Sequence, residues 1–155
     1  MALTALDTKS WVRGWTWSLP DDATCARRAR MLITATLTPL VVCTETVRDI
    51  ALMASELATN ALQHAPGYQP YELWLALADD REAICAIFDT LRVPALTGAP
   101  DLADCDFGRG LAIVAELSDG RWGMYPTWSR QHPEMAGKAV WFACPVTLTV
   151  AMIRP

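Results

Sequence analysis

The stretch ELATNALQHAPG, from Glu56 to Gly67, ends an amphipathic helix that we expect to run from about Thr44 to His64. Ala65 stands before a proline, a position that disfavours helical geometry, so the helix should stop there. Asn60 lies inside this helix although asparagine is a mediocre helix former. It follows Glu56 by one turn, so the two side chains project from one face, about 6 Å apart at Cβ.

The polar face of this helix has two interpretations. Four further polar residues share it: Glu45, Arg48, Asp49 and Gln63. Together they fit a solvated stripe opposite an apolar face. Alternatively, the carboxylate of Glu56 and the amide of Asn60 offer hard oxygen atoms side by side. Such a pair can hold a hydrated magnesium ion and accept a proton from an attacking water or hydroxyl.

A second feature is DFGRGLAIV, where Gly108 and Gly110 flank Arg109 at the expected start of a helix. Glycines let the backbone approach a ligand, and the first helical turn offers unpaired N–H groups at the positive end of the helix dipole. This arrangement suits phosphate, and Arg109 can add charge-assisted hydrogen bonds. A merely flexible turn is the alternative.

A third feature is Asp89, which closes the apolar segment AICAIFD. An acid in this position can simply end a strand in water. Inside a pocket it can instead accept a hydrogen bond from the amino group of a base, which selects adenine over guanine. The order and spacing of the three features favour the pocket.

The composition describes one domain of 155 residues, 52% hydrophobic and 19% charged, which excludes a disordered chain. Five scattered cysteines, never spaced as CxxC, and two histidines argue against zinc and favour reduced thiols. The net charge of −4 and one short basic cluster, RRAR at 27–30, argue against direct nucleic-acid binding. That cluster fits a solvated helix face, or a surface for an acidic partner. No membrane span or signal peptide is visible, so we expect a cytoplasmic protein.

The remaining segments predict an α+β two-layer sandwich, a mostly antiparallel sheet with helices on one face. We expect helices over 22–37 and 44–64 and from GRG onward, with Thr44 as N-cap of the second. Expected strands are WTWSLP (15–20), YELWLALA (71–78), EAICAIFD (82–89), RWGMY (121–125) and KAVWFAC (138–144), with VTLTVAMI (146–153) as a candidate last strand. The domain spans 1–155 with a core over about 15–144.

Two connections stand out. Thr90 to Phe107, rich in proline and aspartate, is too long for a simple loop and is typical of a lid or binding segment. The last two strands are joined by a loop that we expect to pass through Pro126 and Pro133.

The tryptophans fall into two groups. Trp122, Trp128 and Trp141 are expected to pack on the sheet and its edge. Trp11, Trp15 and Trp17 fit either core packing or an exposed surface for a partner or a homodimer. His64 either approaches the lid or a phosphate, or carries partial charge at a helix C-terminus.

These motifs resemble the histidine-kinase-like ATPases, whose Bergerat fold is shared with the gyrase and Hsp90 nucleotide domains. ELATNALQHA is similar to the asparagine box of that family, GRGLAIVAELSDGRWG to its second glycine box and GKAVWFAC to its closing strand. The opening WSLP and the closing GKxVW pattern resemble the bacterial anti-sigma-factor serine kinases. The resemblance covers about Trp15 to Phe142.

The resemblance implies a role for each matching residue. Glu56 would be the general base, Asn60 would bind the magnesium ion that bridges the phosphates of ATP, and Asp89 would contact the adenine amino group. Four residues would wrap the phosphates: Gly108, Arg109, Gly110 and Leu111. The segment 90–107 would be the lid. The glutamate and the asparagine would face the glycine-flanked helix start across a gap the size of a triphosphate.

The resemblance also implies partners: a small anti-anti-sigma protein as substrate and a sigma factor that the domain captures. Two departures favour an alternative, a non-catalytic regulatory binding protein with a degenerate nucleotide site. DTLRVP lacks the glycines that follow the aspartate in the family. Ala139 stands where the closing strand of the family usually has a threonine that would support Asp89. A third interpretation is a detached sensor-kinase domain that phosphorylates a histidine on a separate partner.

Overall fold

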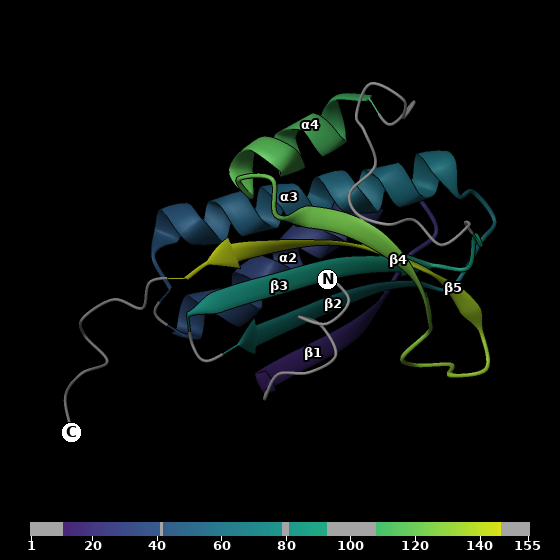
Figure 1. Ribbon diagram of the computed structural model, residues 1–155, viewed down its shortest axis with the longest axis horizontal. Coiled ribbons are helices and arrows are strands. Elements are labelled where there is room, and N and C mark those ends of the chain that lie inside the picture. The colour runs from purple at the N-terminus through teal and green to yellow at the C-terminus, as the bar shows by residue number, and fades with distance from the viewer. Residues whose placement is uncertain (1–10, 41, 79–80, 93–107, 147–155) are drawn as a thin grey trace.

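The computed structural model describes residues 11–40, 42–78, 81–92 and 108–146, and Figure 1 shows how they are arranged. The elements follow in this order: β1 (Trp11–Leu19), α2 (Cys25–Leu37), the short 3-10 helix η1 (Thr38–Leu40), α3 (Thr44–His64), β2 (Tyr71–Ala78), β3 (Glu82–Asp89), α4 (Gly108–Leu117), β4 (Trp122–Trp128) and β5 (Ala136–Pro145). The predicted helices and the five core strands are therefore confirmed.

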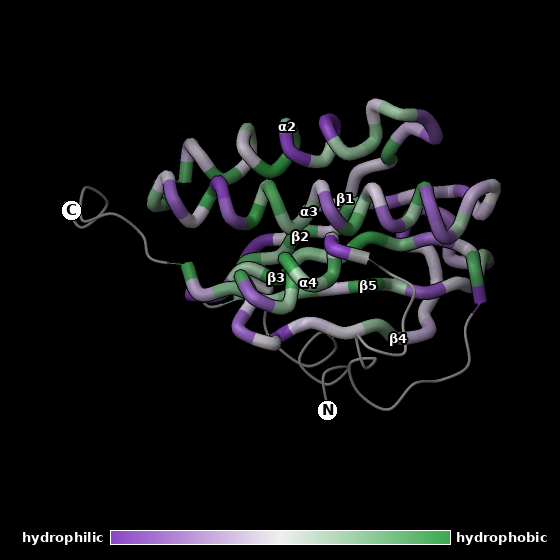
Figure 2. Tube along the Cα trace, turned by 90° about the horizontal axis from the view of Figure 1, so that it is seen from above, coloured by the Kyte–Doolittle hydropathy of each residue, from purple (hydrophilic) through white to green (hydrophobic). Residues whose placement is uncertain are grey.

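The strands form one open sheet in the order β1-β2-β3-β5-β4, and every neighbouring pair is antiparallel. Helices α2 and α3 pack on each other and lie together on one side of the strands (Figure 2), and α4 packs on α3. This arrangement confirms the predicted α+β class with an antiparallel sheet and helices on one face.

The helix layer covers an apolar face of the sheet because side chains alternate along each strand. Leu73, Ile87 and Phe142 point to this face and pack against helical residues such as Ile50 and Leu57, all of them buried. A second buried cluster occupies the opposite face: Trp74, Ile84, Ala86, Phe88, Tyr125, Ala139, Trp141 and Ala143. Strands β2 and β3 are thus buried on both faces, which explains their continuous apolar sequences.

Several local expectations need correction. Helix α3 does begin at Thr44, but Cys43 is the N-cap residue and no side chain caps the helix. Helix α2 begins at Cys25, later than predicted, because the Asp22 side chain accepts the Thr24 backbone N–H at 2.8 Å and holds a turn before it. Pro126 lies within β4 rather than in a loop. A proline is tolerated there because β4 is an edge strand.

The tryptophans divide differently from the prediction. Trp122 and Trp141 are buried in the two faces of the sheet, as expected, whereas Trp128 is 61% exposed at the end of β4. Trp15 and Trp17 are half-buried against the main core, which favours packing over a free surface. The side chain of Trp11, the segment 93–107 of the expected lid and residues 147–153 of the candidate last strand lie outside the described residues.

None of the helices in the described ranges has the length and hydropathy needed to cross a membrane. The basic cluster on α2 is solvated, because Arg27, Arg28 and Arg30 are all exposed while Ala29 faces the core. The structure therefore bears out the interpretation of this cluster as a helix face.

Candidate functional site

The polar pair of α3 lies directly against the first turn of α4. A Cβ atom placed on Gly110 would stand 3.0 Å from Glu56 Oε2 and 3.3 Å from Asn60 Oδ1, so the backbone of α4 touches both side chains. Both side chains are half-buried rather than fully solvated. The two motifs predicted to face each other do meet, because α4 packs across α3 at this turn.

Contact replaces the gap that we expected between these motifs. The sequence predicted room for a triphosphate between the α3 pair and α4, but a side chain even as small as alanine at position 110 would be tight there. The amide nitrogen Asn60 Nδ2 is buried at this contact and has no hydrogen-bond partner in the described structure. An unpaired buried amide costs free energy unless a ligand or water satisfies it, so Asn60 has capacity to bind one.

The other predicted residues of the glycine motif divide between surface and interior. Arg109 is exposed, whereas Leu111 is 2% exposed and belongs to the main core. Gly108 is the first residue of α4. The N–H groups of such a first turn lack intrahelical acceptors.

Asp89 ends β3 inside the protein, only 1% exposed, and both of its carboxylate oxygens accept hydrogen bonds. The backbone N–H of Leu91 donates to Oδ1 at 3.0 Å, and the Lys138 ammonium donates to Oδ2. Lys138 lies on β5 directly opposite Asp89 in the sheet register, and its side chain is only 7% exposed. Asp89 is therefore half of a buried ion pair.

Gly137 brings the two members of this pair together. A Cβ atom at position 137 would lie 2.0 Å from the backbone oxygen of Asp89 and 2.8 Å from the Cα of Thr90. Real Cβ atoms never approach a backbone oxygen so closely, so only glycine allows β5 to pass the end of β3 at this distance. The residue that follows, Lys138, is then aimed at Asp89.

Burial raises the pKa of the Asp89 carboxyl above its usual value, because the charged form loses its contact with water. The Lys138 ammonium and the Leu91 N–H act in the opposite direction and offset only part of this effect. The ion pair therefore offsets part of the free-energy cost of burying the Asp89 charge and adds no net stability beyond that.

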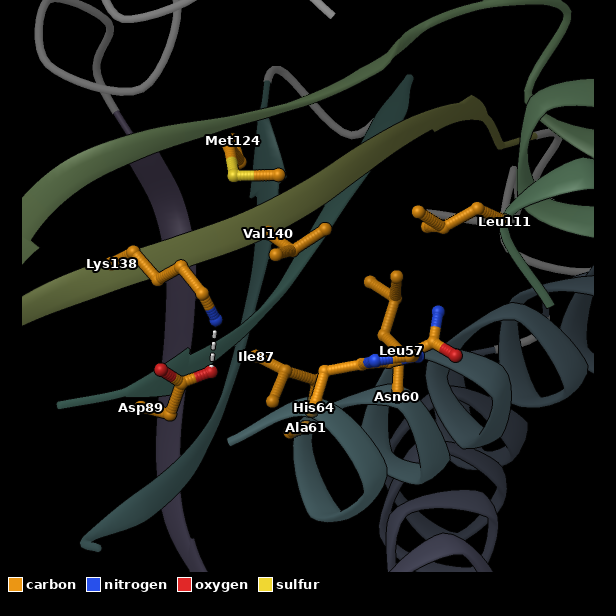
Figure 3. A pocket seen from close by; sticks show the side chains of 10 residues that line it. All are labelled: Leu57, Asn60, Ala61, His64, Ile87, Asp89, Leu111, Met124, Lys138 and Val140. Atoms are coloured by element: carbon orange, nitrogen blue, oxygen red, sulfur yellow. Dashed lines mark hydrogen bonds and ion pairs between the residues drawn. The ribbon is translucent and has the colours of Figure 1, made fainter. Parts of the chain in front are cut away.

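A small, partly open pocket links the two ends of the site (Figure 3). It is lined by Leu57, Asn60, Ala61, His64, Ile87, Asp89, Leu111, Met124, Lys138 and Val140. The figure shows Asn60 and His64 reaching in from α3, and the Lys138 side chain crossing to Asp89. The volume is about 20 Å³, enough for one water molecule and far too small for a nucleotide.

Ala139, which we expected at the site, lies outside it. Ala139, where we expected a hydroxyl that supports Asp89, packs on the opposite face of the sheet and pairs with Phe88. Strand alternation puts Lys138 and Val140 on the cavity side instead. Sequence reasoning therefore missed Lys138, although the period of two along KAVWF, anchored on the core residue Phe142, was a signal that could have found it.

The residues fit one part of an ATP–magnesium ligand and not the other. The unpaired Asn60 Nδ2 is an N–H donor, which suits a phosphate oxygen beside the first turn of α4. Asn60 Oδ1 and the Glu56 carboxylate are the oxygen atoms there that suit magnesium. Asp89 is only 1% exposed, and Leu91 and Lys138 already donate to its two oxygens, so the carboxylate is closed to a base amino group in this arrangement. The base end of the site does not fit adenine in this arrangement.

Comparison with known proteins adds no assignment. No protein-family model matches the chain, and no curated protein matches it at a significant level.

Proposed function

We propose that the protein is an ATP-binding protein serine kinase of the anti-sigma-factor type, built on the Bergerat fold of the histidine-kinase-like ATPases. The observation that supports this best is the meeting of Glu56 and Asn60 with Gly110 at the start of α4. The antiparallel sheet with helices on one face is compatible with that fold. In the proposal a small anti-anti-sigma protein is phosphorylated, and a sigma factor is captured by the same domain.

The chain's own residues would act by positioning and charge. The Glu56 carboxylate would accept the proton of the substrate serine hydroxyl as its oxygen attacks the terminal phosphorus of ATP, and ADP would leave with the electrons of the broken P–O bond. Asn60 Oδ1 would ligate magnesium, which neutralises charge on the phosphates. The N–H groups of the first turn of α4 would bind phosphate oxygens.

This mechanism requires α4 to move. Because Gly110 touches both Glu56 and Asn60, a phosphate group can enter only if the first turn of α4 separates from α3. Helix α4 is held in place by apolar side chains that pack in or against the main core: Leu111, Val114 and Leu117. Nothing covalent prevents their displacement.

The test of the kinase proposal is phosphate transfer from labelled ATP and magnesium to a small anti-anti-sigma protein of the source organism. We expect Glu56→Ala to slow the transfer by about a hundredfold or more, since general bases contribute at least that much. Gln63→Ala, on an exposed position of the same helix, is the matched control and should transfer normally. Absence of transfer by the wild-type chain, or full activity of Glu56→Ala, would contradict the proposal.

A second candidate is a non-catalytic regulatory binding protein with a degenerate nucleotide site. The buried Lys138–Asp89 ion pair favours this second candidate, because the Asp89 carboxylate that a base would contact is already paired with Lys138. The small volume of the cavity favours this candidate as well. In this case partner binding should survive Asn60→Ala, and ATP should bind more weakly than about 1 mM, that is, with less than about 4 kcal/mol.

A further inference from the structure

An open groove of about 520 Å³ lies between α2 and α3, which Figure 2 shows side by side. It is lined by Arg30, Met31, Thr34, Ala35, Arg48, Ala51 and Leu52. Four large apolar side chains are exposed in the described ranges, and two of them, Met31 at 51% and Leu52 at 39%, lie in this groove. Exposed apolar side chains that gather in one place mark an interaction site, whereas single scattered ones do not.

The charge of the groove is positive. Arg30 of α2 and Arg48 of α3 are both exposed, and the other lining residues are uncharged. Neither arginine forms an ion pair with an acidic side chain in the part of the chain that the structure describes. Because the whole chain has a net charge of −4, the groove is a local positive site on a negative protein. A partner that places carboxylates beside the two arginines gains charge-assisted hydrogen bonds there.

The position of the groove between two packed helices suits a third helix. The side chains of packed helices form ridges, and another helix can lay its own ridges in the groove between them. The small residues Thr34, Ala35 and Ala51 share the groove with Met31 and Leu52, so an apolar side chain of a partner can enter between the larger ones. A helix bound in this way contacts the groove through apolar residues at i, i+3, i+4 and i+7.

A second copy of the chain fits this groove less well than an acidic partner does. In a two-fold dimer the same patch meets itself, so the arginines of one copy would face those of the other. Like charges that meet at an interface are unfavourable. We infer that the α2–α3 groove docks an amphipathic helix of a partner protein that carries glutamate or aspartate beside its apolar face. None of the lining residues carries out the proposed phosphate transfer, so this docking is a separate function.

The probes for this surface are two labelled synthetic peptides of about 20 residues, long enough to form a helix. Both have leucine at every third or fourth position, with glutamate beside each leucine in one peptide and lysine in the other. Fluorescence anisotropy with the full wild-type chain should show the glutamate peptide binding about tenfold more tightly, a difference of about 1.4 kcal/mol. The double variant Arg30→Glu with Arg48→Glu should prefer the lysine peptide, because the charge of the groove is then reversed.

Arg28→Glu is the matched control, because Arg28 is exposed on the same helix but does not line the groove. Its ratio of the two affinities should stay within about threefold of the wild-type ratio, since salt screens charges outside the groove over about 8 Å. Leu52→Gln should weaken the glutamate peptide by about tenfold, because a leucine side chain is no longer buried on binding. All of these variants change exposed side chains, and if the double variant does not fold, the wild-type preference decides alone.

Four results would overturn the inference. The first is equal affinity of the wild type for the two peptides, or no binding of either at about 1 mM. The second is a change of preference in Arg28→Glu as large as in the double variant. The third is a wild-type dimer that Leu52→Gln converts to monomers, since a second copy would then cover the groove. The fourth is binding to vesicles of acidic phospholipid that the double variant loses, since a membrane would then be the partner.

Discussion

The two ends of β3 carry the same kind of ion pair in different surroundings. At its start, Glu82 pairs with Arg121, and the two side chains are 28% and 50% exposed. At its end, Asp89 pairs with Lys138, and both are buried. Exposed pairs contribute little because water and salt screen them, whereas a buried pair cannot lose one member without leaving a charge uncompensated.

The comparison explains why only the Asp89 end of β3 has a carboxylate with altered protonation and restricted access. At the Glu82 end the Arg121 side chain is 50% exposed, so the guanidinium can exchange its partner for water at little cost, although Glu82 Oε1 itself is buried. At the Asp89 end burial has already raised the pKa of the carboxyl, and the acceptor is held by the chain itself. A ligand that binds there must interact with the Asp89 carboxylate more strongly than the Lys138 ammonium does, or must leave the ion pair intact.

The largest effect should follow from breaking the buried pair. Lys138→Met keeps the length and volume of the side chain but removes its charge, and it should lower the free energy of unfolding by about 3 to 5 kcal/mol. Urea unfolding followed by tryptophan fluorescence measures this. The double variant Lys138→Met with Asp89→Asn should recover most of the loss, because no charge is left unpaired. A loss below about 1 kcal/mol, as for a surface pair, would contradict the burial of this pair.

The next largest effect should come from Gly137→Ala, which should cost about 3 kcal/mol. The added methyl group would meet the Asp89 backbone oxygen at 2.0 Å, and backbone cannot move aside as a flexible side chain can. Gly14→Ala in β1 is the matched control. A Cβ atom there meets only the Leu75 carbonyl oxygen, at an ordinary 3.8 Å, so that variant should remain within about 0.5 kcal/mol of wild type. Equal stability of the two variants would show that β5 does not approach β3 so closely.

A pH effect distinguishes the ends without a large change in stability. Because burial raises the pKa of Asp89 above its ordinary value of 3.8, its contribution to stability is fully present below about pH 3.8. The contribution is lost as the pH rises through the folded-state pKa. Urea unfolding between about pH 3 and pH 7 should therefore show the wild type losing stability relative to Asp89→Asn as the pH rises. A constant difference would mean that burial does not shift this carboxyl.

The smallest effect is expected at the exposed end. Arg121→Met should lower the free energy of unfolding by only about 0.2 to 1 kcal/mol, because both side chains of the pair with Glu82 are partly exposed. The difference should shrink further in about 1 M salt, where the screening length is about 3 Å. A loss as large as that of Lys138→Met would remove the distinction between the two ends.

The sequence predicted the elements better than it predicted the site. The bounds of α3, Thr44–His64, follow from the amphipathic pattern and the Ala65–Pro66 stop, and the continuous apolar runs of β2 and β3 mark strands buried on both faces. The meeting of Glu56 and Asn60 with the glycine motif was also expected. These features are local, or depend on one packing contact between helices.

The remaining features of the site depend on register, which one sequence does not reveal. Which of Lys138 and Ala139 faces the cavity follows from the pairing of β5 with β3, where Asp89 lies opposite Lys138. The absence of a gap at Gly110 follows from how far α4 settles onto α3, which depends on packing between residues distant in the chain. Both facts bear directly on whether a nucleotide fits.

The most direct test of the central claim is a crystal structure of the wild-type chain with a non-hydrolysable ATP analogue and magnesium. We predict that the triphosphate lies between the first turn of α4 and the pair Glu56 and Asn60, with α4 displaced from its contact at Gly110 and magnesium on Asn60. The Lys138–Asp89 pair should remain closed beside the base. An analogue bound elsewhere on the protein, or a site that stays shut and empty at millimolar analogue, would contradict the account.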